Sequence, residues 1–340
     1  MPATQRGFSL VELMVALVVG LILVAGIAVL FANSSQSAAE FDKSVRQIEN
    51  GRFAVDALVE DISVAGYFDA AAATSYAAAG GACDPGATVA STLNAMRSST
   101  PATLPFPVEG LSAAEAAALP ATCLPHHKAG TPALIVRRLD TTAVGTGSMA
   151  PNLLYMQASH NPADLNATYL VSSDPGALVL KARDGTTNTV RRYLSRIYYV
   201  ASCNECGQDT VPTLKRAELR GTAFAVAPLA EGIDQIAFDY GFDTDNDGTP
   251  EQWRGLNAPT SDVATSGIAT FGWSNVVAVR VHVVSRTTEA SAGFNDARSY
   301  SVGQDGTATL TIGPFNDAFK RRAYTSTARL NSVAGSRERP

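Results

Sequence analysis

Residues 7–32 of this 340-residue chain read GFSLVELMVALVVGLILVAGIAVLFA, a long and almost uninterrupted apolar run. From Phe8 to Ala32 the stretch carries a single charge, the carboxylate of Glu12. A helix of about 20 apolar residues is long enough to cross a bilayer. An ordinary secretory signal has a shorter apolar core, of about 7–15 residues, followed by small residues at the cleavage site. The stretch therefore predicts a membrane-spanning helix over residues 8–32.

Glu12 is the informative residue of this helix. A carboxylate in hydrocarbon costs about 2.5–3.5 kcal/mol on insertion scales, so an acid there needs a partner and a function. Residues 7–13, GFSLVEL, resemble the class III signal of type IV prepilins and pseudopilins. The resemblance implies that a prepilin peptidase cuts between Gly7 and Phe8 and methylates the new amino group of Phe8. It also places the family's acid at Glu12. The alternative is an unprocessed single-pass anchor with its glutamate near the headgroups.

The physical chemistry of a charge in an apolar filament fits this resemblance. Cleavage leaves a protonated amine at the end of a buried helix, and Glu12 of a neighbouring subunit can neutralise it where an unpaired charge is costly. That pairing also sets the axial register between subunits. Arg6 precedes the cut, and residues 1–7 contain no acid. The positive-inside rule therefore places this leader in the cytoplasm and the rest of the chain beyond the inner membrane, in the periplasm.

Residues 33–67 continue the helix as an amphipathic segment. Apolar residues recur at steps of three, four or seven, which is the spacing of one helix face. They are Phe41, Val45, Ile48, Val55, Val59 and Ile62. No proline interrupts residues 8–67, so the sequence predicts one continuous helix that ends near Gly66.

Residues 68–330 form the predicted head, which gives an α+β fold with the long helix packed on an antiparallel sheet. We expect residues 68–130 to be irregular except for a short helix near residues 112–119. Strand-like runs separated by turn residues follow. They are residues 133–139, 153–158, 177–181, 196–201, 223–227, 235–240, 276–284 and 307–312. In residues 276–284 the valine face is expected to cover the helix. Residues 331–340 read as a flexible polar tail.

The four cysteines predict disulfides, because a chain sent across the membrane meets an oxidising compartment. We pair Cys83 with Cys123 and Cys203 with Cys206, since each pair shares a local segment. The sequence alone leaves the other two connectivities open. The Cys203–Cys206 segment follows a strand-like run rather than opening a helix, which favours a structural disulfide over a redox or zinc site. The four histidines, His126, His127, His160 and His282, form no metal-ligand pattern.

Residues 243–251 form a candidate calcium loop. Asp243, Asp245 and Asp247 alternate before Gly248, the Thr249 carbonyl can add a ligand, and Glu251 follows, as in the first part of an EF-hand loop. The twelfth position is an arginine rather than a bidentate glutamate, so Glu251 or another acid would have to close the shell. The alternative is an acidic hairpin turn, where Asp, Asn and Gly are favoured in any case.

Beyond residue 32, six stretches are similar to PilW-type minor pilins, and residues 70–130 carry little of this resemblance. The matching stretches are residues 49–54 (ENGRFA), 65–67 (AGY), 229–233 (LAEGI), 240–245 (YGFDTD), 273–281 (WSNVVAVRV) and 321–330 (RRAYTSTARL). This resemblance implies a minor pilin that primes or tips a type IV pilus. Its implied partners are other minor pilins, the major pilin, prepilin peptidase, an inner-membrane assembly platform and membrane lipid. Its implied location is the inner membrane and then the pilus at the surface of a Gram-negative cell.

Two other functional classes remain as alternatives: a minor pseudopilin of a type II secretion system, and a pilus-tip adhesin or ligand-binding module. The net charge of −5 and the absence of a basic patch argue against nucleic-acid binding. No nucleophile–base or nucleotide-binding motif is present, so we expect no enzyme and no required cofactor, with Ca²⁺ as the one candidate ion.

Overall fold

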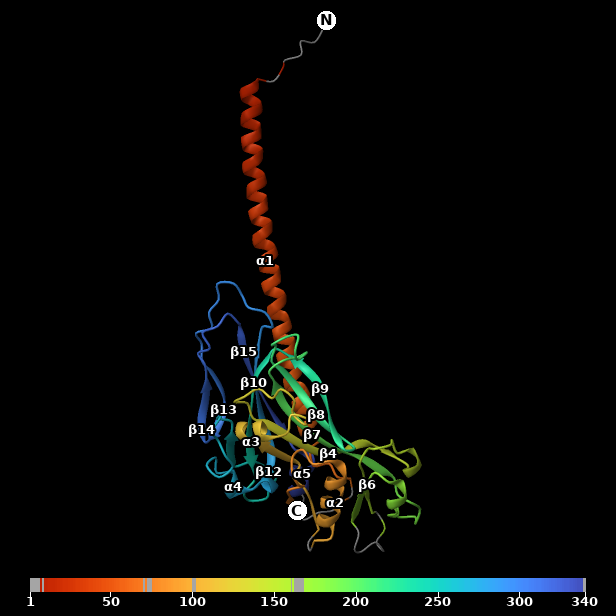
Figure 1. Cartoon of the computed structure of the whole chain (residues 1–340). Coiled ribbons are helices and arrows are strands. Elements are labelled where there is room, and N and C mark those ends of the chain that lie inside the picture. Colours follow the sequence, from red (N-terminus) through yellow and green to blue (C-terminus); the bar gives the residue numbers. More distant parts are fainter. Residues whose placement is uncertain are drawn as a thin grey trace. The chain divides into compact units, whose positions relative to one another are not determined.

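The computed structural model describes residues 7, 9–69, 71, 75–99, 102–159, 161 and 168–338. It divides the chain into two compact units, Met1–Arg46 and Gln47–Pro340. The helices and strands of Figure 1 are α1 (Leu10–Ser63), β1 (Ser75–Ala77), α2 (Gly86–Arg97), β2 (Thr103–Pro105), β3 (Val108–Leu111), α3 (Ala113–Ala118), β4 (Ala133–Val144), β5 (Tyr155–Ala158), β6 (Tyr169–Ser172), β7 (Val190–Ala201), β8 (Thr213–Arg220), β9 (Ala223–Glu231), β10 (Ile233–Phe242), β11 (Gln252–Leu256), α4 (Ile268–Phe271), β12 (Val276–Arg286), β13 (Tyr300–Gly306), β14 (Ala308–Ile312), β15 (Arg321–Arg329) and α5 (Asn331–Arg337).

The first unit contains the apolar part of α1. By length and composition α1 is able to cross a membrane, with a mean hydropathy of 3.1 over its most apolar window. None of that window is buried, which suits a surface that meets lipid. Residues 1–6 and Phe8 lie outside the described residues, so the predicted cleavage site is described only at Gly7.

The second unit contains the rest of α1, which ends three residues before Gly66. Gly66 has a φ of 76°, a left-handed conformation that suits glycine. A Cβ there would come within 2.8 Å of Val333 Cγ2, and the Gly66 N–H leaves the helix to donate to the Arg137 carbonyl at 3.0 Å. The predicted stop at Gly66 is therefore correct to within a few residues.

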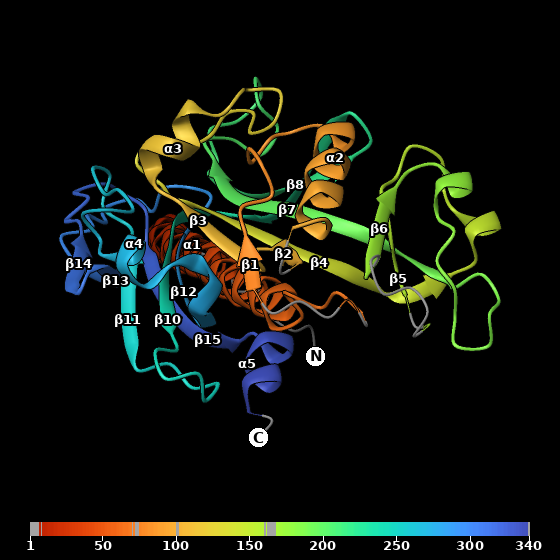
Figure 2. The ribbon, with the colours of Figure 1, turned by 90° about the horizontal axis from the view of Figure 1, so that it is seen from below.

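Two antiparallel sheets pack against residues 47–63 of α1 (Figure 2). One has the strand order β14-β13-β11-β10-β12-β15. The other has the order β3-β4-β7-β5-β6, with β8 and β9 added through β7. Helix and sheet residues share one core, because alternate strand residues point to the same side. Its members include Leu58 and Ile62 from the helix, Val136 and Tyr198 from one sheet, and Val279 from the other.

Strand β12 confirms the predicted valine face. Its odd-numbered valines, from Val277 to Val283, lie in the core cluster that contains the helix residues. Its opposite face is also buried, because Val284 packs with Ala237 and Val302. The predicted α+β class, with a long helix on antiparallel sheets, is confirmed.

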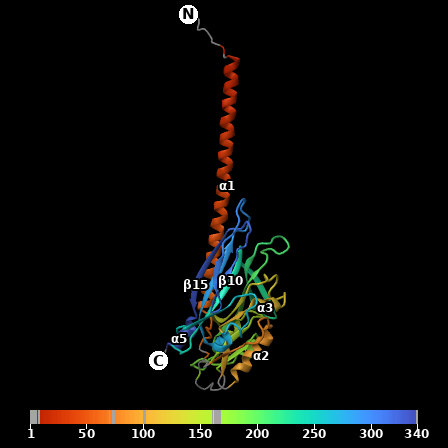
Figure 3. The same cartoon turned by 90° about the vertical axis from the view of Figure 1, so that its left-hand side faces the viewer.

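Residues 68–130 contain the short helix predicted near residues 112–119, which is α3, and also α2 and three short strands in place of the predicted irregular chain. Helix α3 has a complete capping box, in which Ser112 and Glu115 satisfy each other's backbone N–H groups. Helices α2 and α3 lie on one side of the head and α5 on the other (Figures 2 and 3). The segment covers the outer face of the β4–β7–β8 sheet, where Ala116 and Leu124 pack on Ile135.

Two local predictions are wrong. The strand expected at residues 177–181 is absent, because Pro175 and Gly176 form a 3₁₀ turn and the Leu180 N–H donates to the Gln157 side chain at 2.8 Å instead of to a strand. The tail expected to be flexible forms α5 as far as Arg337. Its residue Val333 is 1% exposed and lies in the main core.

Candidate functional site

Glu12 lies in the first turn of α1. Its Oε2 accepts the backbone N–H of Ser9 at 3.0 Å, and the Leu13 N–H donates to the Ser9 carbonyl at 3.2 Å. An acid at a helix N-terminus interacts favourably with the helix dipole. Glu12 is exposed and makes no ion pair among the described residues. The carboxylate is therefore available to a cation from outside the chain.

The acidic loop brings four carboxylates together. Oxygens of Asp243, Asp245, Asp247 and Glu251 all lie within 4.8 Å of one another, and only Asp243 is buried. Asp243 accepts the N–H groups of Asn246 at 2.6 Å and Gly248 at 2.9 Å.

A cation in this loop would have to compete with the groups already bound to its acids. Arg337 of α5 donates to Asp243 Oδ2 at 3.0 Å, and Glu251 accepts the Thr244 N–H at 2.7 Å. Asp247 likewise accepts the Thr249 N–H at 2.7 Å. Desolvation, together with the charges of Asp247 and Glu251, raises the pKa of Asp245. The loop has enough oxygens for a hard cation, but Asp243 is held by an arginine.

The four cysteines form the two predicted pairs. Cys83 and Cys123 are joined with their Cα atoms 6.0 Å apart, and Cys203 and Cys206 with theirs 5.0 Å apart. The first bond links the α2 region to the segment after α3. His126 lies close enough to Cys203 and Cys206 to complete a three-ligand set. Zinc needs thiolates, however, and these sulfurs are bonded to each other.

Two of the remaining histidines have structural partners. His127 Nε2 lies 2.9 Å from the Thr131 carbonyl, and burial lowers its pKa. His282 is buried between Asp239 Oδ2, at 2.9 Å from Nε2, and Thr325 Oγ1, at 3.0 Å from Nδ1. His160 lies outside the described residues.

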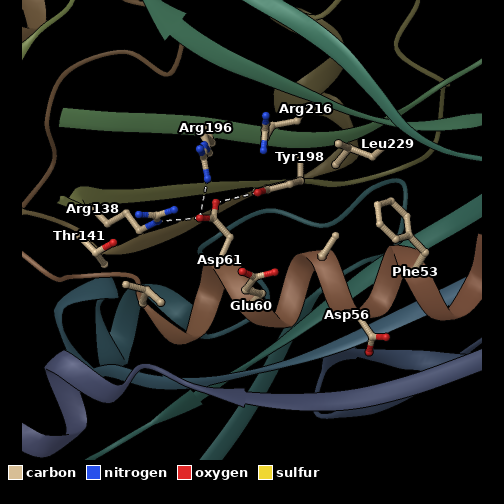
Figure 4. A pocket seen from close by; sticks show the side chains of 12 residues that line it. Phe53, Asp56, Glu60, Asp61, Arg138, Thr141, Arg196, Tyr198, Arg216 and Leu229 are labelled. Carbon is tan, nitrogen blue, oxygen red and sulfur yellow. Dashed lines mark hydrogen bonds and ion pairs between the residues drawn. The ribbon is translucent and has the colours of Figure 1, made fainter. Parts of the chain in front are cut away.

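A buried polar cluster centred on Asp61 was not predicted. Asp61 lies on α1, and its side chain is 5% exposed. It accepts hydrogen bonds from Arg138 Nε at 2.7 Å, Arg196 Nη1 at 2.8 Å and the Tyr198 hydroxyl at 2.7 Å (Figure 4). Desolvation and the Asp61 carboxylate together raise the pKa of Tyr198. A second acid, Glu218, binds Arg196 Nε at 2.9 Å.

A pocket of about 390 Å³ lies beside this cluster. Its walls are residues of α1, β4, β7, β8 and β9, all within the second unit. The sequence contained one signal of the Asp61 cluster, an acid on the buried face of α1. Asp61 follows Leu58 by three residues and Ala54 by seven, which puts all three on one side of the helix.

Comparison with known proteins gives two family matches. Residues 197–332 match the family described as type IV pilus-assembly protein W, PilW, and residues 2–28 match the prokaryotic N-terminal methylation motif. No curated protein matches the sequence. Among solved structures, a type IV-like pilin from Thermus thermophilus is similar, with 9% identity and a TM-score of 0.35. That match covers 85% of this chain and 98% of the other.

The methylation motif, the apolar helix and the helix-on-sheet head together define a type IV pilin-like protein anchored in a membrane. More particularly, the chain is a PilW-type minor pilin with a role in type IV pilus assembly. PilW proteins and pilins are structural proteins of assembly.

Proposed function

We propose that the chain primes or tips a type IV pilus after a prepilin peptidase removes its leader. The observation that carries this proposal is Glu12, the single charge between Leu10 and Ala32, in the first turn of an apolar α1. Cleavage between Gly7 and Phe8 would provide the methylated amine that a neighbouring Glu12 neutralises. An unpaired charge in that apolar setting would cost several kcal/mol, about 3–5 for a buried pair that loses one member.

The same chemistry defines the proposed location and partners. The chain would lie in the inner membrane with its head in the periplasm, where both disulfides can form, and then enter the pilus. Other minor pilins and the major pilin would contact it there, and the assembly platform would supply the driving force. This role needs no catalytic group or cofactor of the chain's own.

Deleting the gene tests this function directly. Surface pili, counted by electron microscopy or in sheared fractions, should fall strongly and return with a plasmid copy. Mass spectrometry of the complementing protein should find a chain that begins with N-methylated Phe8. Unchanged piliation in the deletion strain would contradict the priming role. Loss of secreted enzymes with normal pili would instead support the pseudopilin alternative.

We also propose that the acidic loop binds Ca²⁺ weakly. Support comes from the four clustered carboxylates and from the raised pKa of Asp245, since a cation would relieve the charge repulsion among these acids. The proposed ligands of the ion are Asp245, Asp247 and Glu251. By coordinating all three, the ion would hold the loop after β10 in one conformation.

Calorimetric titration of the full chain in detergent should therefore show calcium binding. At a hundredfold excess over Kd, calcium should raise the free energy of unfolding by about 2.7 kcal/mol. Affinity should fall as pH falls, because protons compete for Asp245, whose pKa is raised. Asp245→Asn combined with Asp247→Asn should abolish the heat, whereas Asp184→Asn in a separate exposed turn should not. Absence of both heat and thermal shift in the wild type would remove the proposal.

A further inference from the structure

The pocket beside Asp61 contains an arginine without a partner among the residues that the structure describes. The helix-facing sides of β4, β7 and β8 each contribute an arginine to it: Arg138, Arg196 and Arg216. Asp61 holds the first two. Arg216 makes no hydrogen bond or ion pair with any residue that the structure describes, and its Nε is buried without an acceptor.

A guanidinium in this position suits a carboxylate. Its planar donor groups match the two oxygens of a carboxylate, and such charge-assisted bonds are among the strongest in proteins. Arg216 pairs with Tyr198 across the β7–β8 ladder, so it lies next to the Asp61 cluster, where the neighbouring cations are already neutralised. A carboxylate brought to Arg216 would therefore satisfy the group that the fold leaves open.

The other walls of the pocket narrow the choice of ligand. Glu60 also lines it and has no side-chain partner among the described residues (Figure 4). Its charge disfavours phosphate and other ligands with several negative charges, while a single carboxylate remains acceptable. Phe53, 53% exposed on α1, and Leu229 on β9 add apolar surface. An exposed aromatic ring beside an arginine is typical of the energetic centre of a protein interface.

We propose that this pocket docks an acidic side chain, with an adjoining apolar residue, from another pilus subunit. The carboxylate pairs with Arg216, and the apolar residue contacts Phe53 and Leu229. This inference rests on the proposed function, because it takes the partner to be a subunit of the same filament. The Asp61 cluster then acts as a fixed wall that leaves Arg216 free for the partner.

Site-specific photo-crosslinking in cells tests the proposal on the full chain. A photoreactive phenylalanine analogue replaces Phe53 or, as the control, Val179, which is 60% exposed and lies outside the pocket. Light should join the Phe53 variant to another pilin, identified by mass spectrometry, and should give no such product at Val179. Arg216→Glu should reduce the product about tenfold or more. Arg183→Ala, at an exposed arginine outside the pocket, should leave it unchanged.

The outcomes separate this inference from the proposed function. Three results would overturn the docking pocket, even if the deletion strain lacks pili. They are crosslinks to pilins from both positions, crosslinks to lipid only, and a pilin crosslink that Arg216→Glu does not reduce. An Arg216-dependent pilin crosslink in cells whose piliation survives deletion would instead support the pocket and contradict the priming role. Arg216→Lys keeps the charge and should retain most of the product. If Arg216→Lys and Arg216→Glu lose the product equally while their thermal unfolding matches wild type, the carboxylate pairing is wrong.

Discussion

Glu12→Gln is expected to leave the chain in the membrane and to remove it from the filament. Glutamine has nearly the same shape as glutamate, and its amide oxygen can still accept the Ser9 N–H that caps α1 at 3.0 Å. Only the charge is lost. If a neighbouring amine depends on that charge, its burial costs about 3–5 kcal/mol without a counterion. Because about 1.4 kcal/mol is a factor of ten, surface pili should fall more than tenfold.

Membrane fractionation and pilus counts measure the two halves of this expectation. The variant should be found in the inner-membrane fraction at the wild-type level, with its leader removed, because the cut at Gly7 does not involve the filament. Glu12→Asp keeps the charge on a shorter side chain and should retain partial piliation. If Glu12→Gln assembles as well as the wild type, the carboxylate serves only as a helix cap, and the charge-pairing account fails.

The N-terminal helix was predictable because only long, almost uncharged segments can span the hydrocarbon core of a bilayer. Few structures other than a membrane helix are compatible with a long apolar run that contains one acid. The helical spacing of Val55, Val59 and Ile62 then predicts that the helix continues into the head. Alternation in β12 likewise indicated which valines face that helix. The short helix predicted near residues 112–119 is α3. The second sheet and α2 were less visible. Helix α2 is held by non-local contacts such as the hydrogen bond from Asn94 to the Val171 carbonyl, which leave no short-range pattern.

The polar cluster was missed for a related reason. Asp61 reads as one more charge on an amphipathic helix, and Arg138, Arg196 and Tyr198 come from strands 77 to 137 residues away. Nothing in the local sequence joins them. In the candidate calcium loop the acids were easy to find in the sequence, but the partner of one of them was not. The hydrogen bond between Arg337 and Asp243 depends on α5, a helix that the sequence did not predict.

Asp61→Ala should destabilise the head by about 3 kcal/mol, the lower end of the cost of breaking a buried ion pair. The lower end applies because the side chains of Arg138 and Arg196 are 15% and 14% exposed and keep some contact with water. Removing the acid leaves both guanidinium groups facing each other, and the buried Tyr198 hydroxyl loses its acceptor. Glu218 still holds Arg196, so the loss stays below that of an isolated charge.

Denaturant unfolding of the full chain in detergent, followed by tryptophan fluorescence, measures this change. Asp56→Ala is the matched control, because Asp56 lies on the same helix, is exposed and has no ion-pair partner among the described residues; it should shift stability by no more than about 0.5 kcal/mol. Asp61→Asn keeps an acceptor for Tyr198, so its free energy of unfolding should lie between those of Asp61→Ala and Asp56→Ala. Equal stability of Asp61→Ala and Asp56→Ala would mean that water in the pocket already screens the arginines. Arg216 would then be screened in the same way, and a partner's carboxylate would gain little from pairing with it.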